Sequence, residues 1–544
     1  MKSSILGLIA IAAVAAPTAT ARVQLPSVIC DGMVVQRGRP VHIWGTADPG
    51  EAVTVKTSAR KAKAVSTTAD SLGRWSVNVP ELKPGGPYVI SVNDQTVSDV
   101  LCGDVFLCSG QSNMELPVRR VTDMFADEIG AYENAQIRHY AVPQTTAFHG
   151  PETDTPKSAW KSCTQDNVMN FSALAYFFAK ELNARTGLPV GIVNASWGGT
   201  PVEAWMSEES LAPWPADLAK KKIYEDDGYR ERIKRLEGEN YGHWNAVLYA
   251  SDPGLHTATR WHDPAFDAND WTEVDLLESA WGQNPANGYN LNGSHWLRRH
   301  VELTAPEASG EAVLRLGCFE GADSAFVNGR FVGTVGYQYP PRIYKVPAGV
   351  LHEGDNVIAV RCISGGGTPR FVLDKPYKLI LADGSEKSLE GLWRHHVGAQ
   401  LPSGPGMIFY HYTPVVLHDA MIAPLQGMNF AGAVWYQGES NVSNRREYAD
   451  KLKAMIAEWR ELLGDADMPF HIVELADFLH SSDTGGRAAW AEMRRMQAKA
   501  ADETPGATLV RNSDLGEWND IHPLDKKTLG IRVADAVIPT LPKT

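Results

Sequence analysis

Four short loops concentrate the side chains whose types and spacing suit chemistry. The first, GQSNM at residues 110–114, follows a short apolar strand expected at 105–108. A serine in a tight strand-to-helix turn can expose its hydroxyl as a nucleophile, and the glycine before it permits close backbone approach. The loop departs from the hydrolase pattern G-x-S-x-G because Met114 occupies the last position. Taken alone, a serine such as Ser112 is more often a helix cap.

The second and third loops offer hydrogen-bond donors. WGGT at residues 197–200 presents backbone N–H groups with little side chain in the way, which suits an oxyanion hole, although an ordinary glycine turn is the commoner use. YQGESN at residues 436–441 contains Gln437, whose neutral amide can donate to an oxyanion, and Glu439, which can orient neighbours or bind substrate. These two loops and the first follow predicted parallel strands, at the edge where open α/β sheets bind ligands.

The fourth loop, DLGEWNDIHP at residues 514–523, precedes the last predicted helix. Its imidazole, His522, titrates near neutrality and can accept a serine proton, so it is the candidate general base. Asp520 lies two residues earlier and can hold the other ring nitrogen. A lone histidine before a proline is more often structural, so this prediction depends on all four loops together.

The elements that must position these loops alternate between strand and helix. The expected elements, in chain order, are a strand at 105–108, a helix at 172–185, strands at 190–194 and 432–436, a helix at 446–463, strands at 470–473 and 508–510, and a final helix at 525–537. This rhythm predicts an α/β fold, a parallel sheet with helices on both faces.

Two further regions carry only strand and turn signals. Residues 22–100 show period-two alternation with turns every 8–12 residues, which predicts an N-terminal β-sandwich. Residues 255–384 contain several strand-like runs and the hairpin signal Asn328-Gly329. They predict a second β-sandwich inserted between the two parts of the α/β domain, 101–254 and 385–544. An insertion costs little where the ends of a surface loop lie close together.

Taken together, the four loops resemble the sialate O-acetylesterase family of the SGNH-hydrolase superfamily. The resemblance covers roughly residues 30–250 and 385–544 and includes GTADPG at residues 45–50. It implies a flavodoxin-like SGNH sheet and a secreted serine esterase that removes acetyl groups from sugar hydroxyls without a metal or other cofactor. The inserted region more loosely resembles the jelly-roll sugar-binding modules of carbohydrate-active enzymes.

The resemblance also implies roles for individual residues. Ser112 is the expected nucleophile and His522 the base. The oxyanion hole is expected to combine the Ser112 N–H, the N–H of Gly199 or of Gly198, and the Gln437 side chain. Other polar and aromatic residues of the loops are expected to bind substrate: Gln111, Asn113, Trp197, Gly198, Glu439, Asn441 and Trp518.

One position departs from the superfamily pattern. Many SGNH enzymes place the acid three residues before the histidine, where this chain has Asn519. Asp520 is therefore the first choice for the orienting carboxylate, with Asp514 and Glu517 behind it. A serine–histidine dyad helped by a backbone carbonyl remains an alternative.

The composition and charge of the chain limit the kinds of molecule that it is expected to bind. The chain has 544 residues and a net charge of −13, and no basic patch stands out, which argues against nucleic acid as a partner. Lys2, the apolar run at 5–16 and the small-x-small pattern at 19–21 predict a signal peptide at residues 1–21 and export to the periplasm or outside the cell. No later run of about 18 apolar residues predicts membrane insertion.

The sequence predicts no metal site and leaves it open whether the cysteines form disulfides. Six cysteines form at most three bridges, their pairing stays open, and no Cys/His spacing typical of zinc occurs. The expected partner is an acetylated carbohydrate, either an O-acetyl sialic acid or an acetylated plant polysaccharide. The alternatives are a lipase or thioesterase of the same superfamily and an inactive carbohydrate-binding protein. The oligomeric state stays open.

Overall fold

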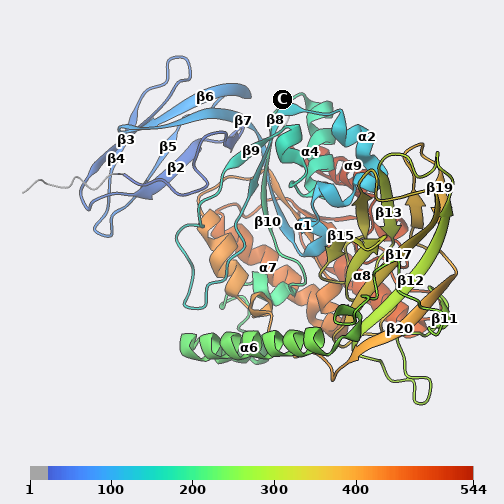
Figure 1. Cartoon of the computed structure of the whole chain (residues 1–544). Helices are drawn as coiled ribbons and strands as arrows, with labels where there is room; N and C mark the ends of the chain where they lie inside the picture. The colour runs from blue at the N-terminus through green and yellow to red at the C-terminus, as the bar shows by residue number, and fades with distance from the viewer. Residues whose placement is uncertain (1–22, 543–544) are drawn as a thin grey trace, which may run out of the picture.

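The computed structural model describes residues 23–542, so the predicted signal peptide lies outside the described residues. A parallel sheet with helices forms the centre, and separate antiparallel sheets lie on two sides of it (Figure 1). The predicted fold class is thus confirmed in its coarse form, an α/β domain accompanied by antiparallel sheets. Within this part of the chain, no helix is both long enough and apolar enough to span a bilayer.

The central sheet has the strand order β23-β22-β21-β7-β10-β8-β9, and every neighbouring pair except β8 with β9 is parallel. Its strands are β7 (Gln95–Gly110), β8 (Asn134–Ala141), β9 (Trp160–Cys163), β10 (Val190–Ser196), β21 (Gly432–Tyr436), β22 (Phe470–Val473) and β23 (Ala507–Val510). Every residue of β10 and β21 is buried, as expected for strands covered on both faces. The strands that come next in the chain after β7, which are β8, β9 and β10, lie on one side of it, and β21, β22 and β23 lie on the other side. A sheet of this kind opens a ligand crevice where the strand order reverses, here between β7 and β21.

The helices follow the local signals closely. The helix predicted at 172–185 is α4 (Ala173–Thr186), where the Ser172 hydroxyl caps the Ala175 N–H and Gly187 ends the helix at φ 67°. The helices at the later predicted positions are α7 (Tyr448–Leu462) and α9 (Lys526–Val537). α4 packs against α9, and α7 packs against α8 (Thr484–Glu503).

Other helices were not anticipated. They are α1 (Ser112–Glu115), α2 (Thr122–Gly130), α3 (Gln165–Val168), α5 (Pro215–Ile223), α6 (Asp227–Ser251) and α8. α6 extends along one side of the molecule in Figure 1, and Leu248 is its one buried residue. Because so little of α6 is buried, it lacks the apolar stripe by which a helix is predicted from sequence.

Four of the six N-terminal strands belong to the same sheet as β7, and the second and fifth form a two-stranded sheet of their own. The six strands are β1 (Val34–Gln36), β2 (Val41–Thr46), β3 (Ala52–Thr57), β4 (Val65–Thr68), β5 (Arg74–Val79) and β6 (Gly85–Val92). β6 pairs with the first half of β7, whereas β10 and β21 pair with its second half. A single strand of 16 residues therefore crosses the expected boundary at residues 100–101 without a linker.

The inserted region forms two antiparallel sheets that enclose their own apolar core. Its strands are β11 (Thr272–Asp275), β12 (Gly293–Leu303), β13 (Ala312–Leu316), β14 (Ala322–Val327), β15 (Arg330–Val335), β16 (Ile343–Val346), β17 (Gly354–Ser364), β18 (Tyr377–Ile380), β19 (Glu386–Ser388) and β20 (Leu392–Gln400). β20 pairs with β11 and β12, so the insertion runs to Gln400 rather than ending at the expected residue 384.

Candidate active site

The first and third loops meet because β7 and β21 are neighbours. Gly110 is the last residue of β7 and has φ +139°, and a Cβ added there would lie 2.1 Å from the carbonyl oxygen of Tyr436 at the end of β21. Only glycine fits this position, since any side chain would separate the two strand ends. The chain then turns into α1, whose first residue is Ser112.

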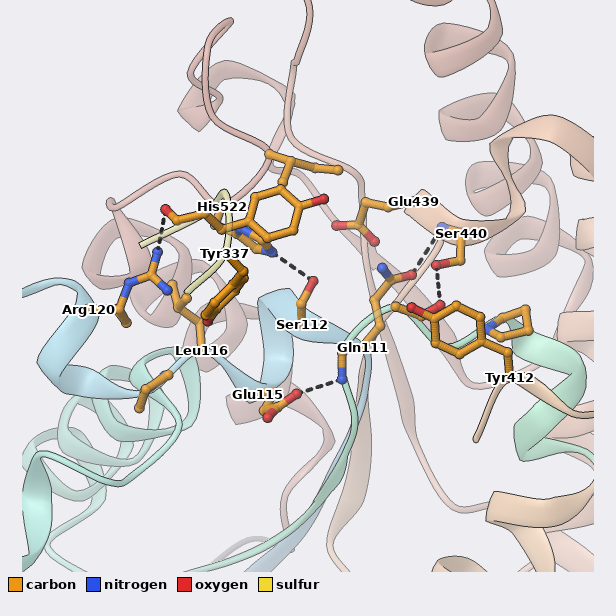
Figure 2. A pocket seen from close by; sticks show the side chains of 16 residues that line it. Gln111, Ser112, Glu115, Leu116, Arg120, Tyr337, Tyr412, Glu439, Ser440 and His522 are labelled. Atoms are coloured by element: carbon orange, nitrogen blue, oxygen red, sulfur yellow. Dashed lines mark hydrogen bonds between the residues drawn. The ribbon is translucent and has the colours of Figure 1, made fainter. Parts of the chain in front are cut away.

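A serine and a histidine face each other at this edge. The Ser112 hydroxyl lies 2.9 Å from Nε2 of His522, which follows β23 in the loop before α9 (Figure 2). The histidine is 6% exposed. The structure therefore brings together the predicted nucleophile and base, 410 residues apart in sequence.

The pair opens into a cleft of about 580 Å³. The cleft is lined by Gln111, Ser112, Glu115, Leu116, Pro117, Arg120, Gly198, Gly199, Pro201, Tyr337, Tyr339, Tyr412, Glu439, Ser440, Ile521 and His522. In Figure 2, Arg120 and Tyr412 lie on opposite sides of Ser112. All four loops singled out in the sequence contribute to this lining.

Two backbone donors are free to receive an oxyanion. Within residues 23–542, the N–H groups of Ser112 and Gly199 donate to no acceptor. The N–H of Gly198 is instead occupied by the Glu115 carboxylate at 2.6 Å, which excludes it as the alternative donor. Gly199 has φ +75°, and a Cβ there would lie 1.9 Å from the Tyr412 hydroxyl, so this turn requires glycine.

The predicted role of Gln437 in the oxyanion hole is wrong. Its side chain is fully buried, and its amide nitrogen donates to the Thr200 carbonyl at 3.0 Å and to Asn441 Oδ1 at 2.7 Å. Its amide oxygen accepts from the Tyr448 hydroxyl at 2.9 Å. Both amide protons are committed because the buried groups around them would otherwise lack partners. Gln437 therefore ties the second loop to the third instead of facing the cleft.

Replacing Gln437 with alanine is expected to lower the free energy of unfolding by about 1–3 kcal/mol, because Thr200, Asn441 and Tyr448 lose a buried partner. Denaturant unfolding of the variant and the parent measures this change. If kcat for ester hydrolysis fell by about 10²–10³ while the free energy of unfolding stayed the same, the oxyanion role would be restored.

Asp520, the predicted acid partner of His522, does not form the expected hydrogen bond with the ring nitrogen Nδ1. Nδ1 of His522 has no hydrogen-bond partner among the described residues, and Asp520 Oδ1 lies 3.9 Å from it. Asp520 is held elsewhere, because Oδ1 accepts the backbone N–H of His522 at 2.9 Å and Oδ2 accepts from Lys375 at 3.2 Å.

The two reserve candidates for the acid are farther from this role. Asp514 forms a two-pronged ion pair with Arg532 at the surface. Glu517 accepts from the backbone N–H of Leu524 and from Lys375. Asp520 is thus the carboxylate that the structure places next to the ring.

Burial and nearby cations keep His522 neutral. Burial is the largest influence, and with the charges of Lys526 and Arg120 it lowers the pKa of His522 to about 3. A neutral imidazole can accept the proton of Ser112 at any ordinary pH. Burial also lowers the pKa of Lys526 to about 8.

A buried polar network supports the floor of the cleft. Asn113 donates to Glu439 at 2.6 Å and to the Ile521 carbonyl at 2.9 Å, and it accepts from Lys526 at 2.8 Å. It therefore connects the first, third and fourth loops. Burial raises the pKa of Glu439, whose second oxygen has no partner among the described residues.

The predicted substrate-binding residues divide into two groups. Gln111, Gly198 and Glu439 line the cleft. The other four residues do not line it: Asn113 and Asn441 are buried in networks, Trp197 stacks on His411, and Trp518 donates to Asp374 of the inserted sandwich. Their loops were identified, but a local sequence does not indicate which side of a loop faces solvent.

Several lining residues were missed. Glu115 stands one residue after the GQSNM motif, and its spacing of three from Ser112 on a helical turn was an available signal. Tyr337 and Tyr339 come from the loop between β15 and β16 of the inserted sandwich, and the rings of Tyr339 and His522 lie perpendicular to each other at a centroid distance of 5.0 Å. No sequence feature connects that loop to the cleft.

The part of the chain that the structure describes holds no group of three or more His, Cys, Asp or Glu side chains placed to bind a metal ion together. The site instead presents a serine hydroxyl, a neutral imidazole and two backbone N–H groups at the edge of a parallel sheet. This set of groups is the one that serine hydrolases use for acyl transfer.

Comparison with known families agrees with the site. A sequence profile of the family "Carbohydrate esterase, sialic acid-specific acetylesterase" matches residues 102–251 and 410–539, which is more than half of the chain. The protein belongs to this carbohydrate esterase family, which confirms the resemblance seen in the loops. The unmatched interval between the two segments contains the inserted sandwich.

Individual relatives extend the comparison. The sialate O-acetylesterase of Homo sapiens is 32% identical over 208 residues, 34% of this chain and 39% of that protein. That of Mus musculus is 32% identical over 187 residues, 31% of this chain and 34% of that protein. The chain thus spans about two fifths or less of these relatives. The crystal structure of a carbohydrate acetylesterase from Xanthomonas citri superposes with a TM-score of 0.54 at 25% identity, covering 95% of this chain and 74% of that chain.

Proposed function

We propose that this protein is a carbohydrate O-acetylesterase that uses Ser112 and His522 in an acyl-enzyme mechanism on an SGNH-type sheet. The observation that carries the proposal is the 2.9 Å contact between the Ser112 hydroxyl and His522 Nε2 in a cleft with two free backbone donors. Membership of the carbohydrate esterase family supports the substrate class. We also propose that the inserted region is a jelly roll and that the protein is exported.

The chemistry follows from these groups. Ser112 attacks the acetyl carbonyl carbon while His522 Nε2 takes the hydroxyl proton, and the oxyanion forms beside the N–H groups of Ser112 and Gly199. The carbon–oxygen bond to the sugar then breaks, and His522 returns its proton to the departing sugar oxygen. Water next attacks the acetyl-enzyme, again losing its proton to His522, and acetate leaves as Ser112 regains its hydrogen.

Asp520 stabilises the charged intermediate in this scheme. Its Oδ1 lies 3.9 Å from Nδ1 of His522, and a negative charge at 4–6 Å or closer favours the imidazolium form. A movement of about 1 Å would bring the two atoms within hydrogen-bond distance. We infer that this contact shortens when the ring becomes charged.

Acetate release from a panel of esters tests the function. The panel contains an O-acetylated sialoglycan, acetylated xylan, acetylated xyloglucan and an aryl acetate. Release from a glycan supports the proposal and names the sugar. Release from the aryl acetate alone would contradict the carbohydrate part, and release from none would overturn the enzymatic assignment.

The aromatic rim of the cleft is expected to bind the sugar. Tyr337 is 56% exposed and lines the same cleft as Ser112, and an exposed aromatic ring in this cleft suits stacking against a sugar ring. Replacing Tyr337 with alanine should raise KM for the acetylated glycan by about tenfold, the equivalent of 1.4 kcal/mol, and leave KM for the aryl acetate within about twofold. Steady-state kinetics on both substrates measures this difference.

The matched control for Tyr337 is Tyr289→Ala. Tyr289 is 75% exposed in the same inserted region and does not line the cleft. It should leave both KM values unchanged. An equal rise in KM for the glycan and the aryl acetate in the Tyr337 variant would argue against ring stacking.

A further inference from the structure

The inserted sandwich contacts the loop that carries His522. The loop between β17 and β18 provides the Leu373 carbonyl, which accepts from Asn519 at 2.6 Å, and the Asp374 carboxylate, which accepts from Trp518 at 3.1 Å. These contacts join residues at least 144 positions apart in sequence. They place Lys375, the next residue of the sandwich loop, beside the acidic residues of the fourth loop.

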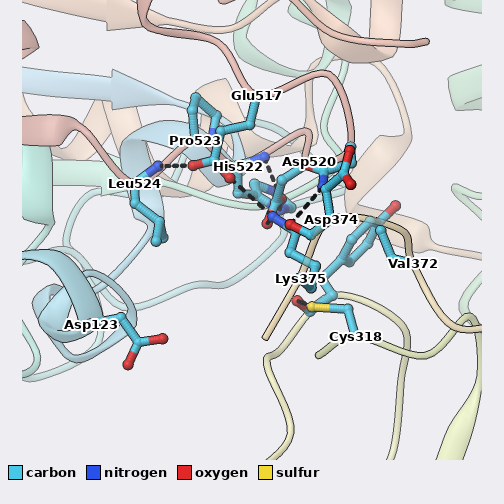
Figure 3. Close-up of polar contacts among 12 residues, drawn as sticks. Asp123, Cys318, Val372, Asp374, Lys375, Glu517, Asp520, His522, Pro523 and Leu524 are labelled. Carbon is cyan, nitrogen blue, oxygen red and sulfur yellow. Dashed lines mark hydrogen bonds and ion pairs between the residues drawn. The ribbon is translucent and has the colours of Figure 1, made fainter. Parts of the chain in front are cut away.

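Lys375 bridges two carboxylates of that loop. Its Nζ donates to Glu517 Oε2 at 2.9 Å and to Asp520 Oδ2 at 3.2 Å (Figure 3). The Lys375 side chain is 12% exposed and that of Asp520 is 14% exposed. Burial alone would lower the pKa of Lys375, but the two carboxylates outweigh it and raise that pKa, so the ammonium is charged at neutral pH.

The same two carboxylates hold the backbone around His522. Asp520 Oδ1 accepts the His522 N–H at 2.9 Å, and Glu517 Oε1 accepts the Leu524 N–H at 2.8 Å. Each carboxylate therefore has one oxygen on Lys375 and the other on the turn that carries the imidazole. The position of the ring relative to Ser112 depends on this turn.

We propose that Lys375 is a positioning residue for His522, so that the inserted sandwich supplies a part of the esterase site. One oxygen of Glu517 and one oxygen of Asp520 contact the same ammonium, so the two carboxylates lie close together. Without the cation the two carboxylates would repel each other, and the repulsion would be stronger than in water because Asp520 is largely buried, although Glu517 is 32% exposed. The turn would then open and move His522 away from the Ser112 hydroxyl. The inference rests on the proposed function of the Ser112–His522 pair.

Three variants of the full chain test the inference. Lys375→Met removes the charge and keeps most of the length of the side chain, Lys375→Arg restores the charge, and Lys378→Met is the matched control. Lys378 lies three residues further along in β18, and its Nζ pairs with Glu386 of the same sandwich at 2.7 Å. Each variant is assayed with the aryl acetate and followed by amide hydrogen exchange.

Lys375→Met is expected to lower kcat by about 10–100-fold with KM changed less than about twofold, because a shift of about 1 Å in a reacting group costs this much. Amides of residues 517–524 should exchange faster, while those of the sandwich strands keep their rates. Lys375→Arg should recover kcat to within about fivefold of the parent, and Lys378→Met should match the parent in both measurements.

Two results would overturn the inference. One is a Lys375→Met protein whose kcat and exchange match those of Lys378→Met. The other is faster exchange throughout the sandwich with no recovery in Lys375→Arg, which would make Lys375 a general fold-stabilising residue. If the parent released no acetate at all, the proposed function would fail, but exchange at residues 517–524 would still decide whether Lys375 orders the turn.

Discussion

Replacement of Ser112 with alanine is expected to reduce acetate release by about 10⁴-fold or more, because no other hydroxyl in the cleft lies within hydrogen-bond distance of Nε2 of His522 in the described structure. Ser112 is partly exposed, and among residues 23–542 its hydroxyl forms a hydrogen bond only with His522, so the loss of one oxygen should leave the fold intact. Acetate release from the aryl ester and the glycans, together with circular dichroism, measures both expectations.

Ser109→Ala is the matched control. Ser109 lies three residues earlier, near the end of β7, is fully buried, and has a hydroxyl without a partner in the described part of the chain. Removing an unpaired buried hydroxyl should be close to neutral for stability and for the rate. A folded Ser112→Ala protein that kept more than about a tenth of the activity would reject Ser112 as the nucleophile.

Loss of the His522 ring is expected to have the second largest effect. His522→Asn should lower kcat by about 10⁴-fold because the proton of Ser112 then has no acceptor at 2.9 Å. His480→Asn is the control, since His480 is exposed and does not line the cleft. Similar kcat values in the two variants would remove His522 from the mechanism.

The dependence of the rate on pH follows from the burial of this ring. The free imidazole has a pKa of about 6.5, but burial, Lys526 and Arg120 lower the pKa of His522 to about 3 in the folded protein. Protonation blocks the base, so kcat/KM should stay constant from about pH 8 down to about pH 5 and decline only below that. An acid limb centred near pH 6.5 in a folded protein would contradict this expectation.

The stability of the fold must be measured in the same experiment, because the free energy of unfolding also decreases as the pH is lowered. The unfolded chain takes up a proton on His522 below about pH 6.5, whereas the folded protein takes it up only near pH 3. Between these values the unfolded state binds more protons, so the free energy of unfolding falls as the pH falls. Near-ultraviolet circular dichroism at each pH separates loss of the base from loss of the fold.

The sequence predicted local elements well where local forces determine them. The helix expected at 172–185 is α4, shifted by one residue, because Ser172 and Gly187 cap it through contacts within a few residues. By contrast, α6 was missed because it lacks a buried stripe, and the boundary at 100–101 was misplaced because β7 continues through it. Pairing with strands distant in sequence is what holds that long strand together.

The side chains of the site likewise differ in whether local sequence or contacts with distant residues determine their role. Gln437 has an amide of the right type in the right loop, but the Thr200 carbonyl, 237 residues away, takes one of its protons. Asp520 is the right neighbour for His522, but Lys375, 145 residues away, takes one of its oxygens. Which donors remain free for a substrate is decided by such distant partners.

The sequence by itself determined the four loops and, through their resemblance to a known family, the carbohydrate esterase family and the pairing of Ser112 with His522. Three of the loops could be placed together because the strand ends of a parallel sheet meet at one edge. Only the tertiary structure decided that Gly199 rather than Gly198 presents a free N–H, that Gln437 is buried, and that the inserted sandwich brings Lys375 and Tyr339 to the site. Hydrogen-bond saturation of buried groups is a property of the folded chain as a whole, and no short segment encodes it.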